Sequence, residues 1–311
     1  MNGALGLGKV SREVFERSVL PFISVEKELE LDGATVSLTD HTVIAHSPSI
    51  GVPLEALGFF AFHYAASNVA CRFGRPTHMI TGVYLPIKTE ERDLKTIAKS
   101  LGDEAKRYGV KIVAGQTATY YGLEIPFVST TCLGEQTRKP SKPQEGDVVL
   151  LIGEVGGEAV WLTKLSKGDK NVRWKDFTAL PKILAINRLN GTRIIHDVSE
   201  GGVKGALSEV LRSIGMGLKF NSADVVYTRG AQKLQGDILR APTYGVIIAI
   251  VEPKSVDEVI DICTKMGAKV SRLGPLKRNK FFIVDGLKVE EQTRIEIDEL
   301  YGSFGKIDEG L

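Results

Sequence analysis

One stretch carries most of the information about fold and chemistry: His196-Asp197-Val198-Ser199-Glu200-Gly201-Gly202-Val203-Lys204-Gly205-Ala206-Leu207. The apolar pair Ile194 and Ile195 precedes it, which predicts a strand that enters a polar turn, and a helix follows the two glycines. Helix N-termini leave N–H groups unpaired and carry a positive dipole end, so they suit phosphate. A purely structural interpretation is equally open, in which Ser199 or Glu200 caps the helix and the glycines form a tight turn.

Outward from this stretch, the chain is predicted to contain two α/β units joined by a polar connection. Residues 138–147 hold two prolines and a glycine between two apolar, strand-like runs, which is typical of an exposed connection. Each unit is expected to cover one face of its sheet. The expected domains are 1–140 and 141–290, followed by a charged C-terminal extension at 291–311.

Hydrophobic periodicity predicts the individual elements. In the first unit it predicts strands at 34–38, 42–46, 79–85, 110–114 and 125–133, and helices at 54–73 and 93–108. In the second it predicts strands at 148–152, 193–195 and 244–251, and helices at 203–213 and 256–266. Gly109, Gly215 and Gly267 each follow a predicted helix, where glycine commonly ends one.

Composition excludes several classes of protein. The 311 residues are 43% hydrophobic and 25% charged, close to globular averages, which excludes disorder, collagen-like repeats and a disulfide scaffold. A net charge of +2 gives no reason to expect nucleic-acid binding. Cys71, Cys132 and Cys263 lie far apart, so neither a zinc site nor a disulfide framework is expected. With no membrane-spanning run and no signal-peptide pattern, we expect no membrane partner and a cytoplasmic location.

Candidate functional residues also occur outside the glycine turn. Gly115-Gln116-Thr117 follows a predicted strand, where α/β proteins place ligand groups, although an ordinary turn fits as well. Asp32 offers a carboxylate suited to Mg²⁺, or else forms an Asp-Gly turn with Gly33.

The helix at 54–73 and the histidines add further candidates. Asn68 either binds a ligand or hydrogen-bonds the neighbouring backbone. His46 and His196 each end a predicted strand, which makes them candidates for direct function. We predict that His63 lies on a helix surface or interface and that Cys71 serves packing.

Seven segments in order resemble one known superfamily over nearly the whole chain. They are Gly8-Lys9-Val10-Ser11-Arg12-Glu13, Asp32-Gly33-Ala34, Ala45-His46-Ser47, Ala65-Ala66-Ser67-Asn68-Val69-Ala70, Gly74-Arg75-Pro76, the stretch 196–202, and Ala241-Pro242-Thr243-Tyr244-Gly245. Together they resemble the aminoimidazole-ribonucleotide-synthetase (PurM-like) superfamily, nearest to its archaeal HypE-like or synthetase-related group.

The resemblance implies a two-domain PurM/HypE-like fold of the α/β (α+β) class. The N-terminal domains of two subunits would pair into a dimeric β-barrel, the C-terminal domain would be an α/β sandwich, and ATP with Mg²⁺ would bind near the dimer interface. It implies that Asp32 holds the metal and that His196 and Asp197 are catalytic. The implied nucleotide-binding residues are Lys9, His46, Asn68, Gln116, Thr117, Glu200, Gly201 and Gly202.

The chain departs from the superfamily where acids are expected. Pro48, Val69 and Gln116 stand at positions where the pattern has acidic or metal-facing residues, which leaves Asp32. Because a nucleoside triphosphate needs its charge neutralised for phosphoryl transfer, we expect metal affinity to be low. HypE also ends in a cysteine that carries a carbamoyl group, whereas the last cysteine here is Cys263, so that chemistry on the tail is not expected.

Three functions remain open at this point. The first is a HypE-like, ATP-dependent enzyme that transfers phosphate to, or activates, an amide or acyl oxygen in hydrogenase maturation, with a maturation partner protein. The second is a catalytically degenerate homodimer that binds nucleotide or serves as a partner subunit. The third is a purine-biosynthesis synthetase module, which would need partner chains. Whether the chain turns over ATP is left undecided.

Overall fold

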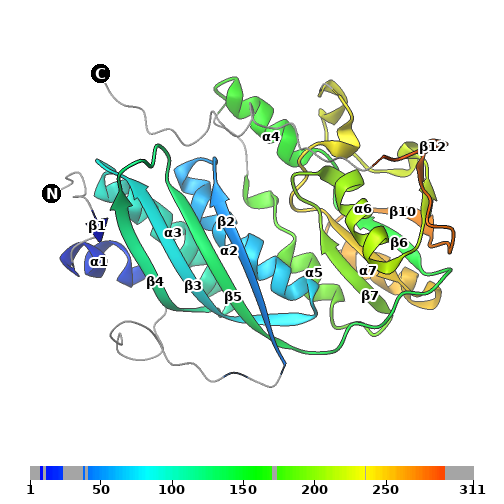
Figure 1. Ribbon diagram of the computed structural model, residues 1–311, viewed down its shortest axis with the longest axis horizontal. Helices are drawn as coiled ribbons and strands as arrows, with labels where there is room; N and C mark the ends of the chain where they lie inside the picture. The colour runs from blue at the N-terminus through cyan, green and yellow to red at the C-terminus, as the bar shows by residue number, and fades with distance from the viewer. Residues whose placement is uncertain are drawn as a thin grey trace. The chain divides into compact units, whose positions relative to one another are not determined.

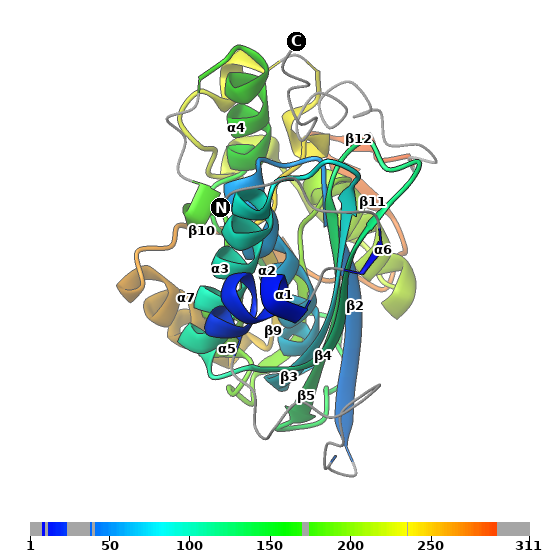
Figure 2. The ribbon, with the colours of Figure 1, turned by 90° about the vertical axis from the view of Figure 1, so that its left-hand side faces the viewer.

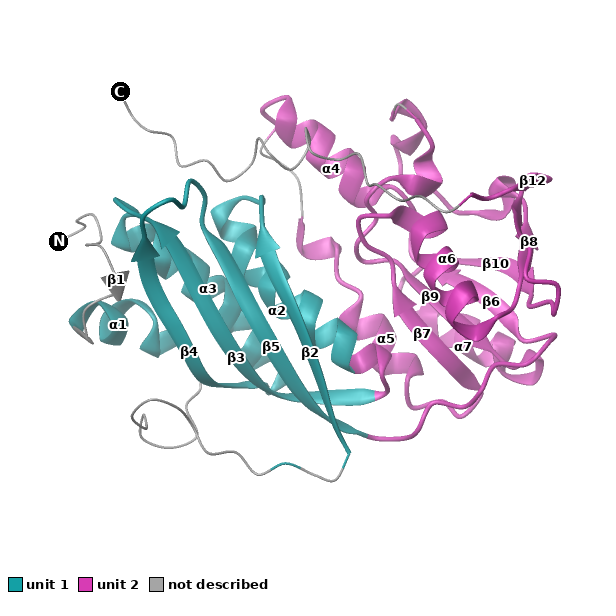
Figure 3. Ribbon diagram, viewed as in Figure 1, with its two compact units in different colours: residues 1–69, 74–136, 298–311 teal, residues 70–73, 137–297 magenta. Residues whose placement is uncertain are grey.

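The computed structural model describes residues 8–9, 12–23, 38, 41–169, 174–234 and 236–290. These residues form two compact units (Figure 3). Unit 1 contains the described residues up to Val69 and those from Gly74 to Gln136. Unit 2 contains the short segment 70–73 and the described residues from Thr137 onward.

Unit 1 is built on a five-stranded sheet (Figure 1). Its strand order is β1-β4-β3-β5-β2, and only the β3–β4 pair is parallel. The strands are β1 (Gly8–Lys9), β2 (Thr42–Ile50), β3 (Gly74–Pro86), β4 (Lys111–Tyr120) and β5 (Phe127–Gln136).

Helix α2 (Leu54–Cys71), whose last two residues belong to unit 2, and helix α3 (Glu91–Tyr108) lie along one face of this sheet (Figure 2). The predicted helices at 54–73 and 93–108 are confirmed, and Gly109 ends α3 in the left-handed conformation, with φ of 68°. Gly58 allows α2 to approach α3, because a Cβ atom there would lie 2.3 Å from the Ile97 carbonyl oxygen. A shorter helix, α1 (Arg12–Ser18), precedes them.

The other face of the five-stranded sheet is covered by none of the described helices of unit 1 (Figure 2). It exposes large apolar side chains, with Ile44 at 61%, Ile50 at 46% and Ile80 at 41% of full exposure. Within the described residues the sheet is open, with β1 and β2 at its edges, so this chain alone forms no closed barrel. We call this surface the open face.

An ion pair attaches α1 to α3. Arg17 donates two hydrogen bonds of 2.6 Å to the Glu91 carboxylate, and the buried Ser18 hydroxyl donates a third. These hydrogen bonds, led by those from Arg17, lower the pKa of Glu91 to about 2 from an ordinary 4.5.

This pKa shift predicts a pH dependence. A carboxylate with a lowered folded pKa contributes stability that is complete above pH 4.5 and is lost as the pH falls toward 2. We therefore expect Glu91→Gln to be less stable than the unmodified chain at pH 6, by a modest amount because Arg17 is half exposed, and equally stable near pH 2. Urea unfolding between pH 2 and pH 6 measures the difference in unfolding free energy between the two chains. A difference that does not change with pH would contradict the lowered pKa of Glu91.

Unit 2 contains a four-stranded sheet of order β10-β6-β9-β7, in which every neighbouring pair is antiparallel. Its strands are β6 (Val148–Ile152), β7 (Thr192–Asp197), β9 (Ile247–Val251) and β10 (Val270–Pro275). A smaller sheet consists of β8 (Leu218–Phe220), β11 (Phe282–Val284) and β12 (Leu287–Lys288).

The helices of unit 2 are α4 (Gly157–Ser166), α5 (Leu180–Ile186), α6 (Gly202–Ile214) and α7 (Val256–Lys265). Short 3-10 helices are at Leu20–Phe22 in unit 1 and, in unit 2, at Trp174–Asp176, Ser222–Asp224, Ala231–Lys233, Ile238–Arg240 and Pro253–Ser255.

Every residue of the central strands β6 and β9 is buried. Alternate residues of these strands pack with α6 and the small sheet in one apolar cluster. Helices α5 and α7 lie on the opposite side of the sheet (Figure 1). Both faces are therefore covered, and the prediction of one covered face is wrong for unit 2. The uninterrupted apolar runs of β6 and β9 are typical of strands buried on both sides.

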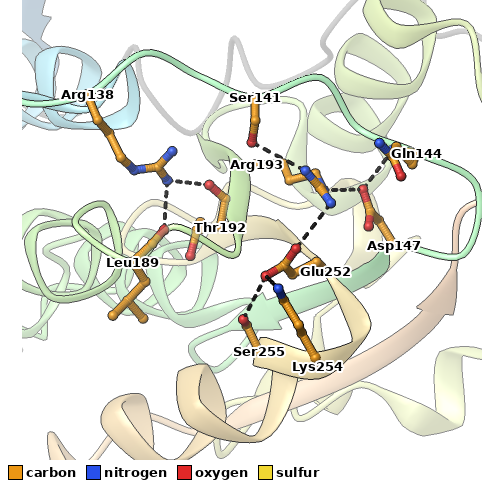
Figure 4. A network of polar contacts seen from close by, with 10 residues as sticks. All are labelled: Arg138, Ser141, Gln144, Asp147, Leu189, Thr192, Arg193, Glu252, Lys254 and Ser255. Atoms are coloured by element: carbon orange, nitrogen blue, oxygen red, sulfur yellow. Dashed lines mark hydrogen bonds and ion pairs between the residues drawn. The ribbon is translucent and has the colours of Figure 1, made fainter.

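Charged residues hold the connection between the units to unit 2 (Figure 4). The Arg138 guanidinium lies 3.8 Å from the centre of the Phe73 ring and donates to the carbonyls of Asn187, Leu189 and Thr192. These contacts satisfy backbone carbonyls near the start of β7, so the role of Arg138 is structural.

A second group of charges surrounds Arg193 in β7. Its Nε lies 2.7 Å from Asp147, just before β6, and its terminal nitrogen lies 3.2 Å from Glu252, just after β9 (Figure 4). Because β6 and β7 both run antiparallel to β9, these residues share one end of the sheet. The turn between β7 and α6 lies at the opposite end.

Candidate functional site

The turn between β7 and α6 in unit 2 contains the strongest sequence candidates. Strand β7 continues through His196 and Asp197, so these residues lie in the strand instead of the turn. The buried Val198 donates its N–H to the Val246 carbonyl, and Ser199 and Glu200 are exposed. The Gly202 N–H closes the turn by donating to the Ser199 carbonyl at 3.0 Å.

Helix α6 begins without a side-chain cap. Gly201 is its N-cap residue, no side chain accepts a hydrogen bond there, and the first turn contains no acidic residue. The prediction that Ser199 or Glu200 caps the helix is therefore wrong. An uncapped N-terminus presents N–H donors and a positive dipole end, which together favour an anion.

Gly202 has a structural role of its own. It has φ of 62°, and a Cβ atom there would lie 2.6 Å from the Leu239 carbonyl oxygen and 2.8 Å from that of Ala241. Packing against this backbone therefore requires glycine whether or not a ligand approaches.

His196 and Asp197 point to opposite faces of the sheet, because successive residues of a strand alternate. The His196 Nε2 lies 3.2 Å from Glu209 of α6. Burial raises the pKa of the Asp197 carboxyl above its ordinary value, and the nearby His196 partly offsets this. The two residues therefore do not present their side chains to one reacting group from the same side of the sheet.

Cys71 lies near Asp197 within unit 2. Burial raises the pKa of the Cys71 thiol, and the charge of Asp197 adds to the effect. A thiol that is buried and hard to ionise is a poor nucleophile, which agrees with the predicted packing role.

The four candidates of unit 1 divide between the two faces of its sheet. His46 is exposed on the open face, where its ring contacts the Thr131 and Ser129 hydroxyls at 2.9 and 3.3 Å. Gln116 pairs with Gly82 in the row that also holds Ser129, so it belongs to the open face as well. Three strand spacings, about 14 Å, separate β2, which carries His46, from β4, which carries Gln116.

Thr117 and Asn68 lie on the helix-covered side. Thr117 pairs with the buried Val83 and is itself 8% exposed, and the Asn68 amide donates to the Ser47 hydroxyl at 3.1 Å. The prediction that Gly115 to Thr117 form a turn is wrong, because β4 continues to Tyr120. Gln116 and Thr117 therefore cannot line one surface together.

Val69 does not offer a ligand position. It is fully buried, and its side chain fills the space beside Gly74 and Gly134, where a Cβ atom would lie 2.8 and 2.4 Å from its methyl group. The preceding residue, Asn68, contacts Ser47 of β2 through its side-chain amide.

The two remaining candidates, Asp32 and Lys9, are not described or are described only in part. Asp32 is outside the described residues. The backbone of Lys9 pairs with Ala118 at the β1 edge, and its side chain is not described. Among the described residues, no three His, Cys, Asp or Glu side chains gather in a way that would hold a metal ion. None of the described helices has the length and apolar character needed to cross a membrane.

Thr243 is a structural residue of unit 2 that was not predicted from the sequence. Thr243 is fully buried and hydrogen-bonds both Gly156, before α4, and Ala241. The signal was present in Ala241-Pro242-Thr243-Tyr244-Gly245, where proline and glycine flank a side chain that can donate and accept.

Comparison with known proteins identifies the family. Residues 26–136 match the N-terminal domain of the AIR synthase related proteins, and residues 144–285 match the C-terminal domain. Hydrogenase expression/formation protein HupE of Azotobacter chroococcum is 24% identical, covering 99% of this chain and 92% of its own length. Carbamoyl dehydratase HypE of Azotobacter vinelandii is 26% identical over 84% of this chain and 81% of its own.

A solved structure shows the same fold. The crystal structure of hydrogenase maturation protein HypE in complex with ATP superposes with a TM-score of 0.81 and 17% identity, covering 93% of this chain and 96% of that one. Both domain models match in order and together span most of the sequence. This chain therefore belongs to the AIR synthase related protein family and has a mixed α/β, two-domain fold like that of HypE.

Proposed function

We propose that this chain is a HypE-like, ATP-binding protein that activates an amide or acyl oxygen by phosphoryl transfer in hydrogenase maturation. The observation that carries the proposal is the uncapped N-terminus of α6 behind the exposed Ser199 and Glu200. The names of the relatives support it, since one is a hydrogenase expression/formation protein and another a carbamoyl dehydratase. The HypE structure with ATP supports nucleotide as the ligand.

The proposed roles follow the geometry of each unit. Backbone N–H groups of the first turn of α6 that follow Gly202, whose own N–H is taken up by the Ser199 carbonyl, would donate to phosphate oxygens, with Glu200, Gly201 and Gly202 at the edge of that site. Contacts of His46, Gln116 and Lys9 of unit 1 with the nucleotide stay predictions from the family resemblance. Asn68 and Thr117 lie on the helix-covered face of the sheet. They would hold helix α2 and the strands in place.

The described residues do not fit Mg²⁺, which prefers hard oxygen ligands. Pro48 and Val69 offer no side-chain oxygen, Gln116 offers a neutral one, and Val69 is buried in the core. Asp32 is the carboxylate that remains for this purpose. This absence of carboxylates supports the alternative function, a catalytically degenerate subunit that binds nucleotide without turning it over.

We also propose that two copies pair through the open face into the barrel expected for the family. The exposed Ile44, Ile50 and Ile80 support this, because large apolar side chains on an uncovered sheet face favour burial against a partner. A maturation partner protein would then bind the homodimer.

Calorimetric titration with ATP, with and without Mg²⁺, tests the function. For an active enzyme we expect binding that Mg²⁺ strengthens and that Asp32→Ala weakens to the metal-free level. The exposed Asp103 of α3, changed to alanine, is the matched control and should bind as the unmodified chain does. Binding that ignores Mg²⁺ would favour the degenerate subunit. No heat in either condition would reject nucleotide binding, and an unchanged affinity in Asp32→Ala would reject the role of Asp32.

A further inference from the structure

Three turns of unit 2 meet at one end of the four-stranded sheet. They are the glycine turn 153–157 after β6, the turn 198–202 after β7, and the segment 241–246 before β9. Strands β6 and β7 both end there, since each pairs antiparallel with β9. The segment 241–246 lies between the other two turns and is hydrogen-bonded to both.

The side chain of Thr243 joins two of these turns. Its hydroxyl accepts the N–H of Gly156 at 3.2 Å and donates to the Ala241 carbonyl at 2.8 Å. The residue has no exposed surface, so water cannot replace these partners. A hydroxyl is the group that accepts one backbone N–H and donates to one carbonyl at the same time.

The backbone of Thr243 reaches the third turn. Its N–H donates to the Ser199 carbonyl at 3.4 Å, and that carbonyl also accepts the N–H of Gly202, the first residue of α6. On the other side, the Val246 carbonyl accepts the N–H of Val198 at 2.9 Å. The position of the α6 N-terminus therefore depends on the position of the segment 241–246.

A buried carboxylate strengthens the connection to the glycine turn. Glu158, 2% exposed, accepts the N–H of Tyr244 at 2.8 Å, and the Ala159 N–H donates to the Pro242 carbonyl. Gly153 and Gly202 let this segment approach closely, because a Cβ atom would lie 2.9 Å from a Val246 methyl group at Gly153 and 2.8 Å from the Ala241 carbonyl oxygen at Gly202.

We propose that Thr243 is a positioning residue, which acts on the ligand through the turn 198–202. Its hydroxyl fixes the segment 241–246 to the glycine turn, and that segment fixes the N–H donors at the start of α6 in the direction of the bound anion. The inference rests on the proposed function, because ATP is the anion expected there. It adds a residue that would not itself touch the nucleotide.

The test compares three variants of the full chain. Thr243→Val keeps the shape and removes the hydroxyl, whereas Thr243→Ser keeps the hydroxyl. Thr137→Val is the matched control, since the Thr137 hydroxyl also donates to a carbonyl, that of Phe73 at 2.9 Å, in the same unit but before β6. Calorimetry with ATP gives the dissociation constant, and amide hydrogen exchange by mass spectrometry reports on residues 155–158 and 198–203.

We expect Thr243→Val to bind ATP about tenfold more weakly, the usual equivalent of one lost hydrogen bond of about 1.4 kcal/mol, with faster exchange in both turns. Thr243→Ser should recover affinity to within about twofold, and Thr137→Val should leave both readouts unchanged. Unchanged affinity or unchanged exchange at 198–203 in Thr243→Val would overturn the proposal, as would an equal loss in Thr137→Val. If the unmodified chain binds no ATP, the proposed function fails, and the exchange data alone then decide whether Thr243 positions the turn.

Discussion

The Gly202→Ala variant is expected to lose about 3 kcal/mol of unfolding free energy, because two penalties add at one position. The residue has φ of 62°, a conformation that L side chains rarely adopt. The added Cβ atom would lie 2.6 Å from the Leu239 carbonyl oxygen and from the Arg240 carbonyl carbon. These contacts are with backbone, so no side chain can rotate away to relieve them.

A second glycine in the same helix is the control for this prediction. Gly205 has no heavy atom within 4 Å of an added Cβ, and its backbone needs no left-handed conformation. Gly205→Ala should therefore stabilise the chain by up to about 1 kcal/mol through higher helix propensity. Urea unfolding of both variants is the measurement. Equal unfolding midpoints for Gly202→Ala and the unmodified chain would show that the backbone contacts of Gly202 do not constrain the residue.

Where hydrophobic periodicity was clear, the sequence predicted the fold well. The amphipathic pattern of α3, with Leu94, Ile97 and Leu101 buried, and the left-handed Gly109 that ends it are confirmed. The family resemblance is confirmed by the two domain matches. Helix α3 could be predicted because a helix with one apolar face, ended by glycine, needs no tertiary information to be recognised.

The turn predicted at Gly115 is wrong because packing between neighbouring strands requires a glycine inside β4. Gly115 suggested a turn after residue 114, yet it lies within β4, because a Cβ atom there would lie 2.3 Å from the Thr81 carbonyl oxygen of the neighbouring strand. Glycine inside a strand often marks such a close approach. The sequence of one strand does not reveal which neighbour approaches it.

The sequence left the position of His63 open for a different reason. Helix α2 is apolar on nearly all sides, so its sequence indicates no single buried face. His63 does not lie on a helix surface, because it is fully buried; it lies where α2 contacts α3, with its Nε2 2.9 Å from Glu104. A charged partner forty-one residues away in the sequence allows a polar ring to be buried there.

The candidate site shows the limit of reasoning from neighbours in sequence. His196 and Asp197 are neighbours in sequence, as are Gln116 and Thr117, yet in each pair the strand places the two side chains on opposite faces. The helix start after the two glycines, at residues 201–202, is confirmed, since a helix N-terminus can be recognised from the local sequence. Residues whose role depends on contacts between segments that are distant in the sequence, such as Thr243, can be identified only once the fold is known.

The Arg193→Met variant is expected to lose about 3–5 kcal/mol of unfolding free energy, as when one partner of a buried ion pair is removed. Arg193 lies between two carboxylates, Asp147 at 2.7 Å and Glu252 at 3.2 Å, and the Asp147 side chain is 3% exposed (Figure 4). Without the guanidinium, Asp147 keeps one backbone N–H, that of Gln144 at 2.7 Å. Its negative charge would then remain buried without a cation, which is the main source of the cost.

Arg75→Met is the matched control, because Arg75 pairs with Glu135 at 3.0 Å on the surface, where the two side chains are 66% and 46% exposed. Exposed pairs contribute about 0–1 kcal/mol, so this variant should unfold close to the unmodified chain. Urea unfolding of both variants gives the comparison, and equal small losses would mean that water reaches the Arg193 group.

A further substitution separates lost attraction from buried charge. If the unpaired Asp147 carboxylate causes the loss, Asp147→Asn should destabilise the unmodified chain but stabilise the Arg193→Met variant, because it removes the charge left behind. Additive losses in the double variant would contradict this and would attribute the effect to packing of the arginine side chain. The sign of the coupling therefore decides whether these charges hold one end of the sheet as an electrostatic unit.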